Sequence, residues 1–113
     1  MAQSSVQAIT LQTIDSATLN NATFTAIDAD GLPQACFLLC FNNASNVSVV
    51  VSYNGITGQD YVVAGQTIER YFQNNASPNG FKAAMAKGTV ISLLSPAGAG
   101  LGDILVSGYY QNS

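Results

Sequence analysis

Apolar and polar residues alternate with a period of two along much of the chain, which is the pattern of half-buried β-strands. The clearest run is 47–53, in which three valines and Tyr53 share one face. The other strand-like runs are separated by clusters of Gly, Pro, Asn and Asp, and they are 6–11, 22–27, 35–41, 61–63, 66–73, 89–94 and 104–110. The sequence therefore predicts an all-β fold, a two-sheet antiparallel sandwich of about seven or eight strands, with a jelly roll as one version of it.

Residues 35–41 predict a strand that is apolar on both faces. Period two places Cys36, Leu38 and Cys40 on one face, and Phe37, Leu39 and Phe41 on the other. A strand tolerates this pattern when both of its faces are covered. We expect it at the centre of a sheet, against the core on one side and a loop, a helix or a neighbouring subunit on the other. A buried helix is the alternative, but Asn42-Asn43 end the run too early.

Residues 81–87 favour a helix, and Gly88 is expected to end it. Asn54-Gly55 after the 47–53 run is typical of a two-residue hairpin turn. The polar residues that follow it keep a longer loop open as an alternative. The length of 113 residues suits one domain over 6–113, with 1–5 as a mobile N-terminus.

Charged residues make up 8% of the chain, against about 25% in a typical soluble domain. Such a surface has little self-repulsion and a low desolvation cost, so it associates readily. Such a surface belongs either to a small polar domain or to one that lies against other subunits.

Three basic residues and a net charge of −3 disfavour nucleic acid and anionic membranes as partners. No apolar run approaches the ~20 residues of a membrane span, and the N-terminus lacks a secretory signal pattern, so synthesis in a cytoplasm is expected.

The sequence is poor in groups that perform catalysis or bind metals, and we expect no catalytic residue, metal or cofactor. Histidine is absent, which excludes Ser-His-Asp and Cys-His arrangements. Asp28 and Asp30 precede Gly31, where aspartate favours a turn over a carboxylate pair or a calcium loop. Cys36 and Cys40 would lie about 13 Å apart on a strand, too far for a disulfide.

Two stretches resemble small virion proteins of tailed bacteriophages. They are residues 51–57, with their Ser-Tyr-Asn-Gly turn, and residues 60–65; 19–24 and 107–111 fit the same pattern. Asn54 stands where those proteins more often have Asp. The resemblance implies a virion component present in many copies, such as a capsid decoration, head-surface, neck or tail accessory protein. Its partners would be capsid or other virion proteins and copies of itself, with no catalytic residues.

The favoured hypothesis is a non-enzymatic structural protein that binds through loops and packed aromatic side chains. The candidate contact residues in loops are Asp28, Asp30, Leu32, Asn54, Ile56, Asp60, Asn75, Pro78, Pro96 and Leu101. The candidate packing or interface aromatics are Phe37, Phe41, Tyr53, Tyr71 and Tyr109. The alternatives are a receptor- or carbohydrate-binding module with an aromatic platform, and a small hydrolase with two carboxylates.

Overall fold

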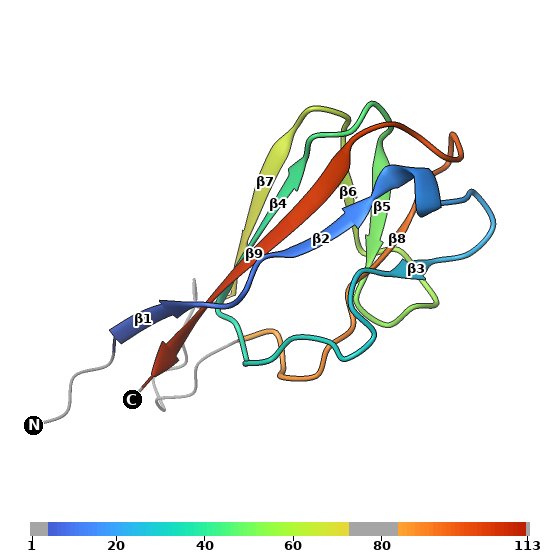
Figure 1. Ribbon diagram of the computed structural model, residues 1–113. Helices are drawn as coiled ribbons and strands as arrows, with labels where there is room; N and C mark the ends of the chain where they lie inside the picture. Colours follow the sequence, from blue (N-terminus) through green and yellow to red (C-terminus); the bar gives the residue numbers. More distant parts are fainter. Residues whose placement is uncertain (1–4, 73–83, 113) are drawn as a thin grey trace, which may run out of the picture.

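Two antiparallel sheets pack face to face in the computed structural model, which describes residues 5–72 and 84–112 (Figure 1). Sheet A contains β1 (Ser5–Ala8), β2 (Gln12–Asp15), β4 (Leu38–Asn43), β7 (Thr67–Tyr71) and β9 (Asp103–Asn112). Sheet B contains β3 (Thr25–Ala26), β5 (Val49–Ser52), β6 (Asp60–Val62) and β8 (Ser92–Leu94). A 3-10 turn, η1 (Ser16–Thr18), follows β2.

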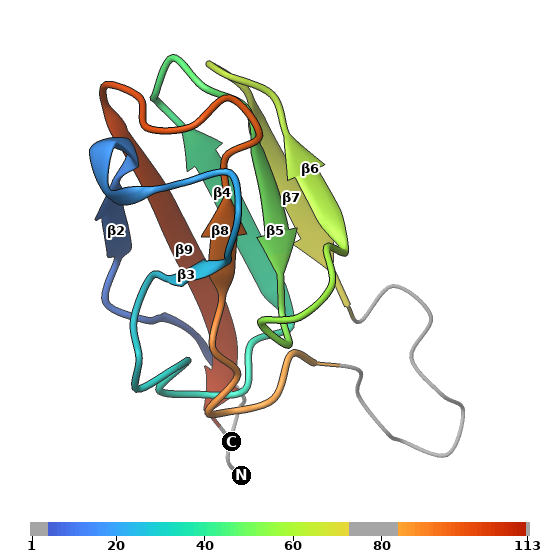
Figure 2. The same ribbon diagram turned by 90° about the vertical axis from the view of Figure 1, so that its right-hand side faces the viewer.

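The strand order is β1-β9-β4-β7 in sheet A, with β2 also paired to β9, and β3-β8-β5-β6 in sheet B. The chain crosses repeatedly between the sheets, which overlap each other in the view of Figure 2, and this is the arrangement of a jelly roll. The predicted all-β, two-sheet antiparallel fold is confirmed. β9 organises sheet A, because β1 and β2 follow each other along one side of it and β4 pairs with the other.

The core lies between the sheets and follows from the alternation in the sequence. Each central strand sends every second side chain inward, and aliphatic residues fill these positions. The buried apolar residues are Ile9, Leu19, Leu32, Cys36, Leu39, Phe41, Val49, Val51, Val62, Ile91, Leu93, Ile104 and Val106. The 47–53 run behaves as predicted, with Val49 and Val51 fully buried in β5.

The predicted faces of the 35–41 run are wrong at its beginning. Cys36 is buried in the core with Leu39 and Phe41, whereas the Phe37 ring lies beside the exposed ring of Tyr71. The cause is a bulge, because Phe37 donates its N–H to the Tyr109 carbonyl while Leu38 is also in register with Tyr109. One extra residue on β4 inverts the alternation before Leu38 and preserves it afterwards.

Two further predictions change in the structure. Residues 81–83 of the predicted helix lie outside the described residues, and residues 84–87 are not helical. Instead, Met85 forms a β-bridge with Cys36, with N–H to carbonyl distances of 2.7 and 2.9 Å. The turn at Asn54-Gly55 is part of a loop over 53–59, so the longer of the two loop alternatives is observed. Only Gly55 has a positive φ there, at 74°.

A buried asparagine fixes the end of the sandwich where β4 passes into the next loop. Asn43 is fully buried, and its amide nitrogen donates to the carbonyls of Val47 (2.8 Å) and Val62 (3.1 Å). Its amide oxygen accepts hydrogen bonds from the backbone and hydroxyl of Ser45. One side chain thereby joins β4 of sheet A to β6 of sheet B, and all its polar atoms are satisfied.

We expect Asn43→Ala to lower the free energy of unfolding by about 2–4 kcal/mol, because it leaves buried carbonyls without donors. Asn42→Ala is the matched control, since Asn42 is exposed on the same strand, and about 0.5 kcal/mol or less is expected. Urea unfolding of both variants measures the difference. Equal losses would contradict a special role for the buried amide.

Candidate functional site

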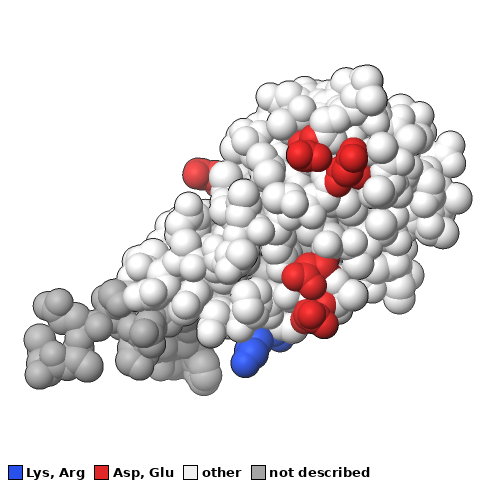
Figure 3. Space-filling model, in the orientation of Figure 1, with Lys and Arg blue, Asp and Glu red and all other residues white. Residues whose placement is uncertain are grey.

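The surface offers three features that could serve a function, and few of its residues are charged (Figure 3). One is a cleft between β2 and the loop after β3. The second is the outer face of sheet A. The third is a hydrogen-bonded group of three side chains that joins the two sheets at their β6 and β7 edges.

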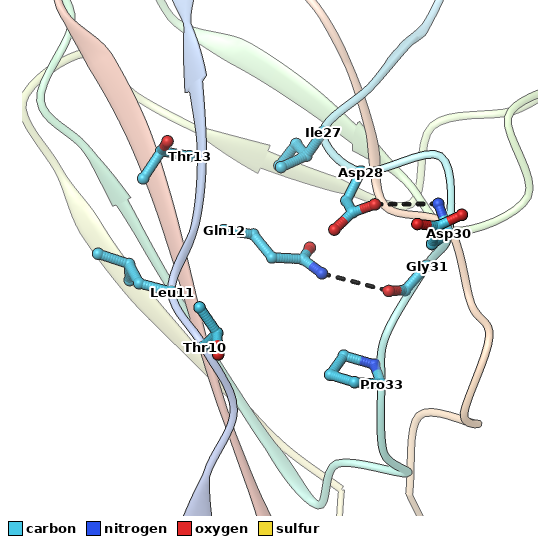
Figure 4. Close-up of a pocket in the computed structure, with 9 residues that line it drawn as sticks. All are labelled: Thr10, Leu11, Gln12, Thr13, Ile27, Asp28, Asp30, Gly31 and Pro33. Atoms are coloured by element: carbon cyan, nitrogen blue, oxygen red, sulfur yellow. Dashed lines mark hydrogen bonds between the residues drawn. The ribbon is translucent and has the colours of Figure 1, made fainter.

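The cleft has a volume of about 430 Å³ and lies where an edge of sheet A faces an edge of sheet B. One wall is residues 10–13 and the other belongs to 27–33, and its lining consists of Thr10, Leu11, Gln12, Thr13, Ile27, Asp28, Asp30, Gly31 and Pro33 (Figure 4). Leu11 and Thr13 line the cleft although Figure 4 shows their side chains turned away from the loop. Their backbone therefore borders the cleft.

A bulge shapes the first wall. Ala8 is in register with Tyr109 and Gln12 with Val106, so β1 and β2 are joined by one residue more than the matching stretch of β9. From Gln12 onward the even-numbered residues direct their backbone N–H and carbonyl groups toward β9. Ser16 continues this pattern, because its N–H donates to the Gly102 carbonyl. In an antiparallel ladder the intervening Thr13 must direct its N–H and carbonyl to the other side. No described strand pairs with that side of β2.

Asp28 and Gly31 fix the second wall by a local turn. The Asp28 carboxylate accepts the N–H of Asp30 at 2.9 Å, and the Asp28 carbonyl accepts the N–H of Gly31 at 2.9 Å. Gly31 has a φ of 78°, and a Cβ at this position would lie 2.4 Å from the Gly88 carbonyl oxygen. Only glycine fits at this position. The turn that the sequence predicts from its Asp and Gly residues is therefore observed.

Gln12 spans the cleft between its two walls. It is 8% exposed, and its amide nitrogen donates to the Gly31 carbonyl at 3.3 Å. This bond assigns the amide oxygen to the opposite side, where Figure 4 shows it turned toward the Asp28 carboxylate. The cleft therefore has two facing hydrogen-bond acceptors, and nothing in the described part of the chain donates a hydrogen bond to the amide oxygen.

The outer face of sheet A carries the alternate residues of β4, β7 and β9 that do not enter the core. Its central side chains are Leu38, Cys40, Asn42, Thr67, Glu69, Tyr71, Leu105, Ser107 and Tyr109. Leu38 is in register with Tyr71 on one side and Tyr109 on the other, so an apolar row crosses the three strands. Tyr71 is 57% exposed, and Leu38 and Tyr109 are partly exposed.

The third feature is a chain of hydrogen bonds from Tyr53 through Asp60 to Arg70. The Tyr53 hydroxyl donates to one Asp60 oxygen at 2.7 Å, and Arg70 Nε donates to the other at 2.8 Å. Asp60 lies on β6 and Arg70 on β7, so the ion pair joins the two sheets. Burial and, secondly, the hydrogen bond to Asp60 raise the pKa of Tyr53 well above its ordinary value of 10.0.

The two cysteines are both free thiols in different surroundings. Cys36 is fully buried, and this burial raises the pKa of its thiol, which keeps it in the unreactive protonated form. Cys40 is partly exposed on the outer face of sheet A.

The structure separates the residues that the sequence singled out. Asp28 and Asp30 share the cleft, but Leu32 is 1% exposed and belongs to the core, so it is not available as a contact. Phe41 is likewise a core residue. Ile56 and Leu101 are 79% and 75% exposed, and they lie in loops at opposite ends of the sandwich (Figure 1).

The remaining candidates fall into three groups. Asn54 and Pro96 are exposed in loops, and Asn75 and Pro78 lie outside the described residues. Phe37, Tyr71 and Tyr109 face outward from sheet A, whereas Tyr53 and Asp60 belong to the hydrogen-bonded group. Sequence reasoning missed Gln12 and the cleft, because no pattern indicated that 10–13 would face 27–33.

Within residues 5–72 and 84–112, no group of three or more His, Cys, Asp or Glu side chains could hold a metal ion. The same ranges contain no helix long and apolar enough to cross a membrane.

Comparison with known proteins gives a fold relationship. No family model and no curated protein matches the chain. Among solved structures, the chain is similar to a protein of Bacillus endospore appendages, described as a novel family of disulfide-linked pili. The TM-score is 0.50 at 18% sequence identity, over 99% of this chain and 93% of that chain. The likeness therefore covers the whole jelly roll and extends to the fold alone.

The raised pKa of Tyr53 predicts a loss of stability at high pH. Above pH 10 the unfolded chain ionises this phenol while the folded protein keeps it neutral, so rising pH lowers the free energy of the unfolded state relative to the folded state. We expect the free energy of unfolding to fall between pH 10 and 11, with up to about 1.4 kcal/mol of the loss absent in Tyr53→Phe. The buried Cys36 thiol adds a loss in the same direction.

Urea unfolding at several pH values measures these slopes. Tyr61→Phe, which removes an exposed phenol from β6, is the control and should keep the slope of the unaltered protein. A Tyr53→Phe slope equal to that of the control would contradict the assignment.

Proposed function

We propose that this chain is a non-enzymatic structural subunit that acts in many copies and associates through the outer face of sheet A. The observation that carries the proposal is the apolar row of Tyr71, Leu38 and Tyr109, which crosses β7, β4 and β9 on that face. Side chains of this kind are expected beneath another layer of protein.

The two outer faces of the sandwich differ, which supports this choice. On sheet B, a Cβ at Gly58 would lie 2.3 Å from a Val50 methyl group and 3.9 Å from the Phe24 ring, so loops of the chain itself cover β5. Ser52 and Ser92 point to the same outer side and are buried. On sheet A, the outward side chains of Leu38, Cys40 and Leu105 are partly exposed, so the described part of the chain does not cover them fully.

The charge distribution favours association on the same face. Among the outward side chains of β4, β7 and β9, the charged groups are Glu69 and, at the beginning of β9, Asp103. Burial of this face by a neighbouring copy would therefore desolvate very little charge. The shared fold with a pilus protein agrees with a structural role, since it shows that this jelly roll occurs in an appendage.

Leu38→Arg tests the proposed interface, because it places a charge in the middle of the apolar row without entering the core. We expect it to reduce the assembled fraction at least tenfold, as measured by sedimentation velocity or electron microscopy, with the melting temperature nearly unchanged. Leu101→Arg is the matched variant in an exposed loop. Loss of assembly in Leu101→Arg alone would assign the contact to the loops and reject the face.

Protection of Cys40 from alkylation gives an independent measure of the same contact. Cys40 should react in the dissociated protein and be protected in the assembly, while buried Cys36 stays slow in both. A cysteine at the exposed position of Asn21, in a Cys40→Ala background, should remain reactive throughout.

For the biological setting we propose a virion, as the resemblance to small phage proteins implies, with capsid or other particle proteins as neighbours. We expect mass spectrometry of purified phage particles to find the chain in many copies per particle. Its recovery in fibres separate from particles would instead favour an appendage like that of the structural neighbour.

A second candidate is a carbohydrate- or receptor-binding module, which the exposed aromatic residues of sheet A favour. Phe37 and Tyr71 have ring centroids 5.9 Å apart, and Tyr109 lies on the same face across Leu38. Glycan-array binding that Tyr71→Ala abolishes, by a protein that stays monomeric, would support this candidate over assembly.

A further inference from the structure

We propose that the cleft beside β2 binds an extended segment of a different protein, which adds a strand to the free edge of β2 and inserts a lysine side chain. This site is distinct from the outer face of sheet A, and it does not depend on the proposed self-assembly.

The free edge supplies the backbone contacts. Thr13 directs its N–H and carbonyl away from β9, and its backbone borders the cleft. An incoming strand would pair with these groups as in other cases of strand addition. The residue of that strand opposite Gln12 would project on the same side as the Gln12 side chain, which is the side of the cleft.

The polar groups in the cleft select the inserted side chain. The Gln12 amide oxygen and the Asp28 carboxylate are acceptors that face each other, so a ligand between them must donate hydrogen bonds (Figure 4). Asp28 makes no ion pair with the described part of the chain. A primary ammonium has three donors and a positive charge, whereas Ca²⁺ needs six to eight oxygen ligands, more than these groups offer.

The shape of the cleft agrees with a lysine. Ile27 and Pro33 line the wall opposite β2 and offer apolar surface to a methylene stem, while the ammonium reaches the acceptors. The described basic residues of the chain itself do not fit the role. Arg70 is paired with Asp60, and Lys87 precedes Gly88, whose N–H is bonded to the Leu32 carbonyl within its own molecule. Lys82 lies outside the described residues, and the proposal commits to a lysine of a different protein as the occupant.

Fluorescence anisotropy with a labelled, acetylated Thr-Val-Lys-Val-Thr peptide tests the proposal on the full chain. We expect saturable binding that weakens about tenfold or more when norleucine replaces the lysine, because the charged hydrogen bonds are lost. Asp28→Asn should cause a similar loss while keeping the turn, since Asn retains the acceptor for the Asp30 N–H.

Asp15→Asn is the matched control, because Asp15 caps the Ala17 N–H in the same way at 2.9 Å but lies outside the cleft. Its affinity should change less than twofold. Thr13→Pro removes the outward N–H and should abolish binding, whereas Thr13→Val should preserve it; thermal unfolding verifies that each variant is folded. Equal binding of the norleucine peptide, or an equal loss in Asp15→Asn, would overturn the proposal.

These results are separable from the test of self-assembly. Leu38→Arg should bind the lysine peptide normally, because Leu38 pairs with Tyr71 and Tyr109 and does not line the cleft. Loss of peptide binding in Leu38→Arg would assign the peptide to the outer face of sheet A and reject the cleft.

Discussion

Close packing around Gly108 governs the path of sheet A. A Cβ at this position would lie 2.9 Å from Cys36 Sγ, 3.0 Å from Ile9 Cδ1 and 3.1 Å from Leu39 Cδ2. The absence of a side chain lets β9 pass directly beneath two irregular neighbours, the bulged start of β4 and the bend between β1 and β2. Both irregularities shape the candidate sites, since one turns Phe37 outward and the other forms the first wall of the cleft.

The sequence was sufficient for the regular parts of the fold because they follow from local alternation. Val49 and Val51 are buried as their spacing predicts, and Gly31 turns the chain where Asp-Ala-Asp-Gly indicates. A period of two cannot reveal an inserted residue, so the bulge at Phe37 was not predictable. The helix expected over 81–87 reflects alanine and lysine propensity, which at Met85 yields to pairing with Cys36.

The candidate sites were harder to predict because they depend on topology. Asp28 was recognised as a turn residue, but its relation to Gln12 exists only because the edge of sheet A meets the loop that follows the edge of sheet B. The outer face was anticipated more directly. A strand that is apolar on both faces needs a packed layer against each face. The observed fold supplies one such layer, the core around Leu39 and Phe41.

The register of β1 on β9 has a mechanical consequence. Ser5 pairs with Asn112, and the pairs that follow lie successively farther from the two ends of the chain. Tension applied between the ends would load these hydrogen-bonded pairs one after another, in the manner of a zipper, instead of shearing them together. A subunit pulled in this way would release β1 at low force while the hydrogen bonds around Asn43, at the far end of the sandwich, remained unloaded.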